Sequence, residues 1–311
     1  MPGGMALHVL DDGERTLHGF FSRELAPVLT IDSGDRVRLS TLDAGWNLEP
    51  HAAPGVPSRH IRPGEPGHAL RGPVEIRGAE PGMTLQVRVD RLEPGAWGWT
   101  HAGGVPTPLN QRLGVAGEPA AWLLWALDRE RMTGRDQFGH TVALRPFLGV
   151  MGMPPPEPGR HPTAPPRRWG GNLDCRELVA GSSLFLPVPV AGALFSCGDG
   201  HAAQGDGEVG GTAIECPMEV CELTLTLHND VGIAVPWAET PAGTLTIGLD
   251  ADLDEAMVAA LGAAIDLLQA RLRLARAEAL ALASVIVDLR VTQVANGTWG
   301  VHALVPAGAL G

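Results

Sequence analysis

The stretch 84–92, TLQVRVDRL, decides the fold class of this chain. Leu85, Val87 and Val89 fall on one face of an extended segment, whereas the polar residues between them fall on the other. Such alternation is typical of a β-strand with one buried face. The segment therefore predicts a sheet that covers a hydrophobic core.

Further predicted strands lie on both sides of this stretch. The segment 34–41 repeats the alternation, and 222–230 and 243–250 are strand-like as well. Residues 182–200 predict a buried strand, a turn and a second strand, and two prolines place the first of these at a sheet edge or at a bulge. The apolar segment 118–132 is compatible with a short helix or a strand.

The predicted helices come late in the chain. Residues 252–272 begin with Asp252 as a plausible N-cap, followed by acidic residues in the first turn. A second helix is predicted over 275–286, and 285–294 returns to strand. The pattern predicts a mainly β architecture with a small C-terminal α+β part.

The composition narrows the function classes. The 311 residues carry a formal net charge of −12 without a basic block, so nucleic acid is not an expected partner. The acidic N-terminus is unlike a signal peptide, and no apolar stretch reaches the roughly 20 residues of a membrane-spanning helix. The four cysteines lack zinc-finger spacing and predict reduced thiols in a cytoplasmic protein.

The stretch 198–208, GDGHAAQGDGE, concentrates metal-ligand side chains among glycines. His201, Asp206 and Glu208 offer one imidazole and two carboxylates, a set that suits Zn or another divalent ion. The alternative is a tight hairpin with solvated acidic residues. A dinucleotide-binding loop is not expected, because no helix follows the glycines.

Two further residues are candidate ligands. Asp174 follows Gly-Gly-Asn in 170–174, where it could instead cap a turn, and His68 precedes a Gly-Pro turn, where it could be structural. Nucleophiles are weakly indicated, because Cys175 and Cys197 lie in strand-like segments. The chain has no lysine, which excludes two lysine-dependent catalytic arrangements, Ser-Ser-Lys and Glu-Lys-Cys.

Four segments carry a resemblance to a known family. The stretch 170–215 resembles the signature core of the acetamidase/formamidase family, and 68–89 and 281–306 resemble its upstream and C-terminal motifs. The opening 18–41 is similar too. The segments follow one another in the family's order over nearly the whole chain.

The resemblance implies hydrolysis of short aliphatic amides, such as formamide or acetamide, at a divalent-metal site. It also implies a β-sandwich core, jelly-roll-like, which we expect to span 1–215 and to carry most of the site. The α+β part then spans 216–311. The family's polar residues fall on positions already singled out from their chemistry: His68, Asp174, His201, Asp206 and Glu208.

These residues are assigned roles as follows. We expect the metal, Zn first and Ca or another divalent ion as alternatives, to be held by two or three of His68, Asp174 and His201. Glu208 or Asp206 is the expected general base, which takes a proton from water.

Substrate contacts are expected from another set of residues. Asn172 and Gly200 would contact the substrate, and backbone N–H groups of the Gly-rich loop would help to hold the oxyanion. Many relatives have His where this chain has Trp169, and Trp169 would form an apolar wall. Gly210 replaces a cysteine that relatives often carry.

Two alternatives remain open at this point. The chain could hydrolyse a larger amide or a related C–N bond, as the Trp169 departure suggests. It could instead be a β-sandwich protein that binds Ca²⁺ and a small ligand without turnover. We also expect a homodimer or a higher homo-oligomer.

Overall fold

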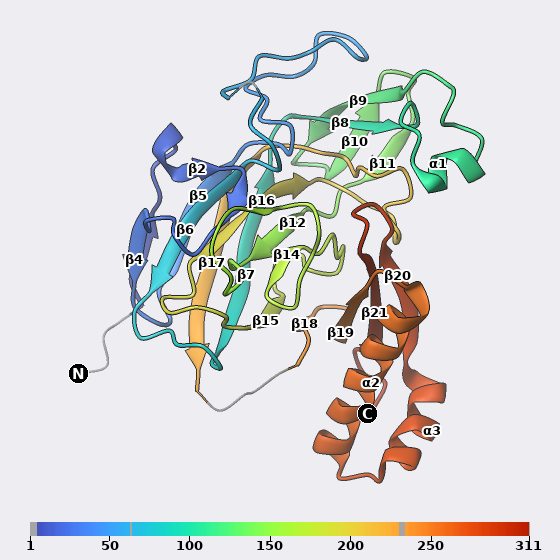
Figure 1. The fold of residues 1–311 in the computed structure, drawn as a ribbon. Coiled ribbons are helices and arrows are strands. Elements are labelled where there is room, and N and C mark those ends of the chain that lie inside the picture. The colour runs from blue at the N-terminus through green and yellow to red at the C-terminus, as the bar shows by residue number, and fades with distance from the viewer. Residues whose placement is uncertain (1–4, 63, 230–233, 311) are drawn as a thin grey trace.

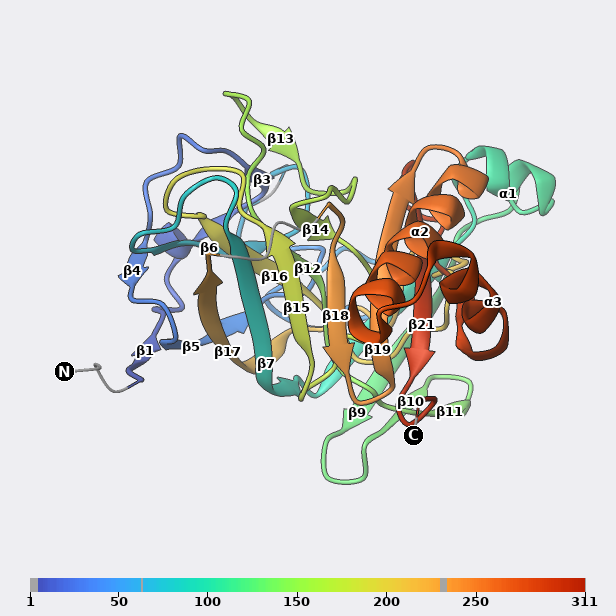
Figure 2. The same cartoon turned by 90° about the horizontal axis from the view of Figure 1, so that it is seen from below.

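The computed structural model describes residues 5–62, 64–229 and 234–310. Strands take up 40% of the chain and helices 13%, which confirms the prediction of a mainly β fold with a small helical part. Figures 1 and 2 show the strands gathered in several sheets, with the two long helices to one side.

The largest sheet has nine strands, which come from both the N-terminal and the C-terminal parts of the chain. The predicted segment 84–92 lies inside its strand β7, where Leu85, Val87 and Val89 are fully buried. In spatial order the strands are β1 (Leu7–Val9), β5 (Arg36–Thr41), β17 (Met218–His228), β7 (Thr84–Pro94), β15 (Ser183–Pro187), β18 (Trp237–Thr240), β19 (Gly243–Asp250), β21 (Trp299–Pro306) and β20 (Asp288–Gln293).

A six-stranded sheet packs against the large one through a shared hydrophobic core. Its members are β14 (Gly170–Asn172), β12 (Phe147–Gly152), β16 (Phe195–His201), β6 (Leu70–Ile76) and β2 (Leu17–His18) in spatial order, with β4 (Leu29–Ile31) also paired to β6. One cluster of buried side chains includes Val87 and Leu225 from the large sheet, and Leu148 and Phe195 from the smaller one. The two sheets therefore bury their apolar faces against each other.

Smaller elements complete the β part. A four-stranded sheet consists of β11 (Thr141–Ala143), β10 (Thr133–Asp136), β9 (Ala121–Asp128) and β8 (Trp97–Ala102), and a short pair joins β13 (His161–Pro162) to β3 (Phe20–Phe21). The ambiguous segment 118–132 thus contains strand β9 and no helix. Two short helical segments are η1 (Glu14–Thr16) and α1 (Pro108–Arg112).

The helices α2 (Leu253–Leu272) and α3 (Arg276–Ile286) lie where the sequence predicts them (Figure 2). Asp252 caps α2 by accepting a hydrogen bond from the backbone N–H of Asp254 at 2.8 Å. A face of small residues, among them Ala256 and Ala260, packs α2 closely on β19 and β21. Within the described ranges, no helix combines the length and the apolar character needed to cross a membrane.

One strand prediction was wrong in its position. Strand β15 was predicted at an edge or a bulge, but it lies inside the nine-stranded sheet, between β7 and β18, and its register with both neighbours is continuous. Its pairing with β18 covers only Ser183 to Phe185, so Pro187 pairs with β7 alone. Because no strand pairs with Pro187 on the side of β18, the missing N–H of the proline costs no hydrogen bond there. The predicted strand 222–230 corresponds to β17, although residue 230 lies outside the described residues.

The predicted division at residue 215 remains a prediction. The large sheet contains strands from both sides of that position, since β17 lies between β5 and β7. The two predicted parts thus share one sheet.

A buried histidine makes the stability of this fold depend on pH. His18 Nδ1 donates to the carbonyl oxygen of Phe20 at 2.7 Å, and Nε2 lies 3.0 Å from the Ser196 hydroxyl. Burial lowers the pKa of His18 from 6.5 to about 4. The unfolded chain therefore binds a proton that the folded chain rejects between these values.

We expect the His18 contribution to stability to be complete above pH 6.5 and to be lost as the pH drops towards 4. The His18 contribution to the free energy of unfolding should decrease by about 2 kcal/mol between pH 7 and pH 5. Urea titrations of the wild type and of His18→Gln at both values measure it. An equal pH-dependent loss in the two proteins would contradict the expectation.

Candidate metal centre

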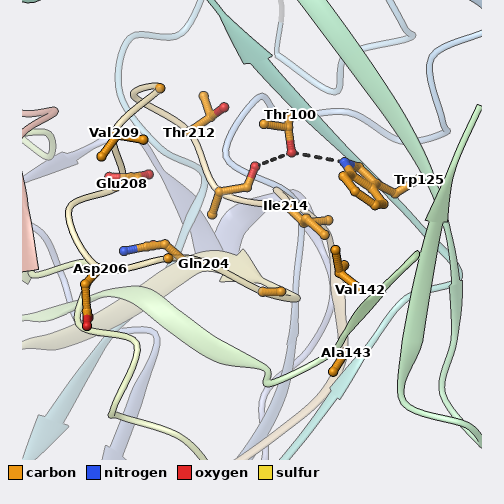
Figure 3. Close-up of a pocket in the computed structure, with 14 residues that line it drawn as sticks. Thr100, Trp125, Val142, Ala143, Gln204, Asp206, Glu208, Val209, Thr212 and Ile214 are labelled. Atoms are coloured by element: carbon orange, nitrogen blue, oxygen red, sulfur yellow. Dashed lines mark hydrogen bonds between the residues drawn. The ribbon is translucent and has the colours of Figure 1, made fainter. Parts of the chain in front are cut away.

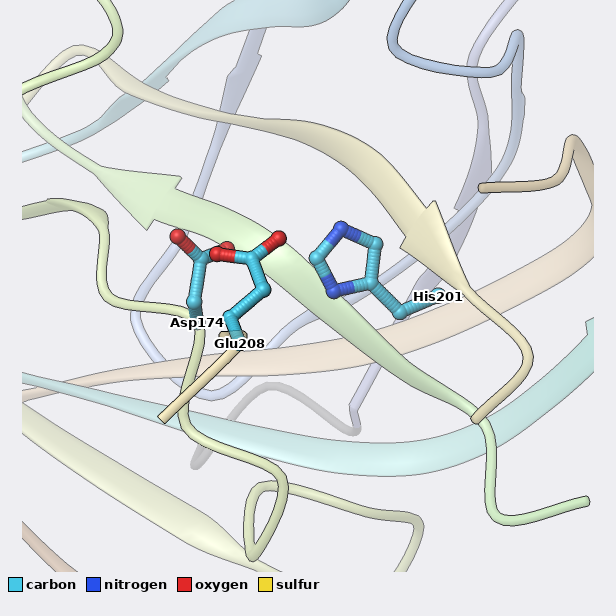
Figure 4. A group of neighbouring side chains, drawn as sticks. All are labelled: Asp174, His201 and Glu208. Carbon is cyan, nitrogen blue, oxygen red and sulfur yellow. The ribbon is translucent and has the colours of Figure 1, made fainter. Parts of the chain in front are cut away.

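One imidazole and four carboxylates converge at the end of β16. Asp199 and His201 are two positions apart on this strand, so both side chains point to the same face. Glu215 lies opposite His201 in an isolated antiparallel bridge. Asp174 follows β14, and Glu208 comes from the loop after β16; Figure 4 shows their carboxylates next to each other and beside the His201 ring.

These side chains form two groups that share His201. Ligand atoms of Asp174, His201 and Glu208 lie within 4.8 Å of one another, and the same holds for Asp199, His201 and Glu215. All five residues are buried, and the most accessible of them, Glu208, is only 6% exposed. Four buried carboxylates beside one imidazole are unfavourable unless protons or a cation compensate their charge.

Gln204 determines which ring nitrogen of His201 carries the proton. Its Nε2 donates to the carbonyl oxygen of Asp174 at 2.8 Å, so its amide oxygen faces the ring and lies 2.9 Å from His201 Nδ1. An amide oxygen can only accept a hydrogen bond, so Nδ1 is the donor and Nε2 of the neutral ring presents a lone pair. Histidines that bind metals are commonly oriented in this way.

The His201 lone pair faces oxygen atoms. Nε2 lies 3.2 Å from Glu215 Oε2 and 3.4 Å from Asp199 Oδ1. None of these three atoms, nor Asp174 Oδ1, has a hydrogen-bond partner among the described residues. Two ligand atoms bound at about 2.0–2.1 Å by a tetrahedral ion lie about 3.4 Å apart. The residues present therefore fit a divalent cation.

Without a cation, protons must compensate the charge. Burial raises the pKa of Asp174 to about 6 and that of Glu215 to about 7. Burial and the neighbouring Asp174 also hold the pKa of Glu208 well above its usual range. For His201 burial acts in the opposite direction, but the carboxylates of Glu215 and Asp199 outweigh it and raise its pKa. The cluster thus retains protons that a cation would displace.

The backbone of this cluster is strained. Asp174, Asp199 and Glu208 have φ values of 47°, 60° and 43°, in the left-handed region that residues other than Gly adopt uncommonly, with Asn and Asp tolerating it better than Glu. Gly149 on β12 leaves room for two of them, because a Cβ there would lie 2.4 Å from Asp199 Oδ2 and 2.7 Å from Asp174 Oδ1. Strain at three carboxylates of one cluster indicates a functional site.

His68 reaches the cluster but belongs to neither group of ligand atoms. It lines a cavity of about 230 Å³ together with Asp199, Glu208 and Glu215. Burial acts to raise the pKa of Asp199, but the charges of His201 and, to a smaller extent, of His68 contribute to a net lowering. His68 Nδ1 lies 2.8 Å from the Thr163 hydroxyl. His68 is thus placed beside the cluster, at its cavity.

Asp206 is not brought into the cluster. Its carboxylate instead groups with Glu177 and His302, whose ligand atoms lie within 4.8 Å of it and of each other. Two arginines, Arg145 and Arg290, pair with Glu177, so this second group already has compensating positive charge. Asp206 therefore lies away from the cluster around His201, where a general base would have to be.

The three predicted substrate contacts are placed differently. Asn172 is buried and lines the cavity of His68, with Oδ1 unpaired within the described part of the chain. Trp169 is half-buried and is not among the residues that line this cavity. Gly200 lies on β16, where a Cβ would come within 2.6 Å of the Cys216 carbonyl oxygen. Its lack of a side chain thus permits close strand packing.

The sequence reasoning missed Asp199, Gln204, Glu215 and Asn296. Asn296 Nδ2 donates to Asp174 Oδ2 at 2.7 Å, although 122 positions separate the two residues. A signal existed for Asp199, because continuing the predicted strand through His201 puts both on one face. A weaker one existed for Glu215, an acidic residue within the apolar run Ala213–Cys216. Nothing local indicates Asn296.

We expect Gln204→Leu to lower the affinity for divalent metal by about 10- to 100-fold, because the proton of His201 Nδ1 loses its acceptor. Gln204→Glu should lose less affinity, since its carboxylate can still accept from Nδ1 although it cannot donate to Asp174. Competition with a chromogenic chelator measures both variants. Equal affinity in the wild type and in Gln204→Leu would show that this hydrogen bond does not orient a ligand.

Comparison with known proteins gives evidence on the family of this chain that is independent of the geometry of the site. A model of the acetamidase/formamidase family matches residues 8–161 and 158–239. The acetamidase of Yersinia enterocolitica has 26% sequence identity and a TM-score of 0.85, and the alignment covers 100% of this chain and 94% of that one. The acetamidase of Bacillus halodurans has 25% identity and a TM-score of 0.82, covering 96% and 97%.

A Schizosaccharomyces pombe protein, provisionally named a formamidase, is 27% identical over 247 residues. These residues make up 62% of this chain and 59% of that protein, so the chain spans less than two thirds of this relative.

Proposed function

The chain belongs to the acetamidase/formamidase family, and from that premise we propose that it hydrolyses a linear amide to ammonia and a carboxylate with the help of one divalent metal ion. The observation that carries the proposal is the buried lone pair of His201 Nε2. It faces oxygen atoms of Asp199 and Glu215 at separations that suit two ligands of one ion.

We assign the metal ligands accordingly. Asp199, His201 and Glu215 would hold the ion, with Asp174 as a further candidate ligand. One imidazole with two carboxylates suits Zn, whereas Ca prefers six to eight oxygen ligands. Such an ion supplies Lewis-acid chemistry, which acidifies water and polarises an amide carbonyl.

Glu208 is our candidate for the general base. It is buried next to Asp174 and His201, and it also lines the cavity of His68 and Asn172. As a carboxylate it takes a proton from the water that attacks the amide carbon, and it then returns this proton to the nitrogen as the C–N bond breaks. Asn172 and His68 offer polar groups that could orient the amide.

Covalent routes are disfavoured by the surroundings of the nucleophiles. Burial raises the pKa of Cys175 and of Cys197 to about 12, so both remain unreactive thiols. The hydroxyl of Ser182 donates to the carbonyl oxygen of Glu177, and that of Ser183 lies 3.1 Å from Gln86 Nε2. Neither serine lines the cavity of the centre.

The proposal extends to location and assembly. All four cysteines are free and buried, in keeping with a cytoplasmic protein. We retain the expectation of a homodimer or a higher homo-oligomer.

The test combines two measurements on one sample. Elemental analysis should find about one divalent ion per chain, and an ammonia-release screen should find turnover of at least one linear amide. Metal binding without ammonia from any amide would overturn the proposed hydrolysis and favour a protein that binds metal and a small ligand. Full turnover after exhaustive chelation would overturn the role of the metal.

A further inference from the structure

A second, larger cavity adjoins the candidate general base. It has a volume of about 510 Å³, and Figure 3 shows residues that line it, Glu208 among them. Glu208 also lines the smaller cavity of about 230 Å³. Its walls include Trp125, Val142, Ala143 and Ile214. Cavities of roughly 300–1,000 Å³ typically hold ligands far larger than formamide or acetamide.

The polar side chains in the walls of this cavity are already engaged. The Thr100 hydroxyl donates to the carbonyl oxygen of Ala213 at 2.6 Å and accepts from Trp125 Nε1 at 3.1 Å. The Thr212 hydroxyl donates to the carbonyl oxygen of His101 at 2.8 Å and accepts from its N–H at 3.0 Å. A ligand in this cavity therefore meets mainly apolar surface.

Gln204 is also engaged, because both ends of its amide are bonded to Asp174 and His201. Asp206 groups with Glu177 and His302. Of the acidic residues in the walls, Glu208 is thus the one that also belongs to the metal centre. The cavity thus has mainly apolar walls, with the candidate general base Glu208 at one end.

Resting on the proposed amide hydrolysis, we infer that the larger cavity binds an apolar substituent of the substrate, so that amides with an alkyl or aryl group larger than methyl are preferred over acetamide. The amide group lies at Glu208, and the substituent extends along Val142, Ala143 and Ile214. Each methylene group removed from water in such a cavity stabilises the complex, until the cavity is filled.

The test is a series of amides with the metal-loaded wild type. Ammonia release should give kcat/KM values that rise about fourfold for each added methylene from acetamide to hexanamide. A parallel series of N-alkyl acetamides, followed by acetate release, covers a substituent on the nitrogen. A rise in either series supports the inference. Efficiency that falls with length in both series overturns it and leaves the proposed hydrolysis intact.

A pair of variants tests whether this cavity causes the preference for longer amides. Ala143→Phe fills part of it from an exposed strand position, and it should lower kcat/KM for hexanamide at least about tenfold more than for acetamide. Thr141→Phe adds the same ring two positions away on the same strand face, outside the cavity lining, and should leave both values unchanged. Equal effects of the two variants on hexanamide would overturn the inference.

Binding separates the two proposals if no amide is turned over. Calorimetric titration of metal-loaded Glu208→Gln should show tighter binding of hexanamide than of acetamide. Such binding without turnover in the wild type would support the cavity assignment while the proposed hydrolysis fails. Neither binding nor turnover would overturn both.

Discussion

Glu208→Gln should lower the turnover of amide substrates by roughly 10²- to 10⁴-fold. Glutamine is nearly isosteric with glutamate but cannot take a proton from water, so the loss concerns proton transfer and not the shape of the site. Because Glu208 is buried against Asp174, removal of its charge also relieves repulsion in the cluster. The variant should therefore remain folded and retain its metal. Ammonia release, metal content and thermal unfolding measure the three properties.

The matched control is Asp206→Asn, which changes a carboxylate to an amide on the same loop. Asp206 groups with Glu177 and His302, so this variant should retain turnover within a few-fold of the wild type. If Glu208→Gln loses its metal together with turnover, Glu208 is a ligand and not the base. If Asp206→Asn has the larger effect, the assignment of the base is wrong.

Asp199→Asn should lower the affinity for the divalent ion by more than about 100-fold, since loss of an outer hydrogen-bond partner alone costs up to that much. Turnover should fall to the background level. Asparagine tolerates the φ of 60° found at this position, so the backbone needs no adjustment. Despite burial, the charges of His201 and His68 lower the pKa of Asp199, so its carboxylate stabilises the metal-free fold. The metal-free variant should therefore unfold at a lower temperature than the metal-free wild type.

Equilibrium dialysis at fixed free zinc, followed by elemental analysis and calorimetry of the metal-free proteins, measures these effects. Asp206→Asn again serves as the control, because it removes the same charge outside the cluster. An Asp199→Asn protein that keeps one ion per chain and normal turnover would exclude Asp199 from the ligands. A higher unfolding temperature without metal would show that the Asp199 charge is not compensated in the metal-free cluster.

Local patterns predicted the elements of this fold better than the members of its site. The alternation at Leu85, Val87 and Val89 indicates burial on one face of a single strand, and the Asp252 cap indicates the start of one helix. Both predictions depend only on residues that are neighbours in the sequence. The position of β15 was predicted wrongly because it depends on how far a separate strand, β18, extends alongside it. Sheet order is a long-range property.

The candidate site divides in the same way. His201 and Glu208 stand out in the sequence through their unusual setting among glycines, and the structure places both in one group with Asp174. Asp199 was overlooked because the predicted strand ended at residue 200, whereas β16 continues through His201 and places both side chains on one face. Asn296 could not be predicted, since its contact with Asp174 depends on the C-terminal hairpin reaching the six-stranded sheet.

The position of β17 in the large sheet affects how the chain can fold while it is being synthesised. Strands β5 and β7 do not border each other; β17 lies between them and pairs with both. While the ribosome has not yet released residues 218–228, the chain holds the two flanking strands without the one that joins them. Unpaired strand edges attract other chains. A nascent chain that stalls before this point thus exposes two such edges, which makes it a natural client for chaperones.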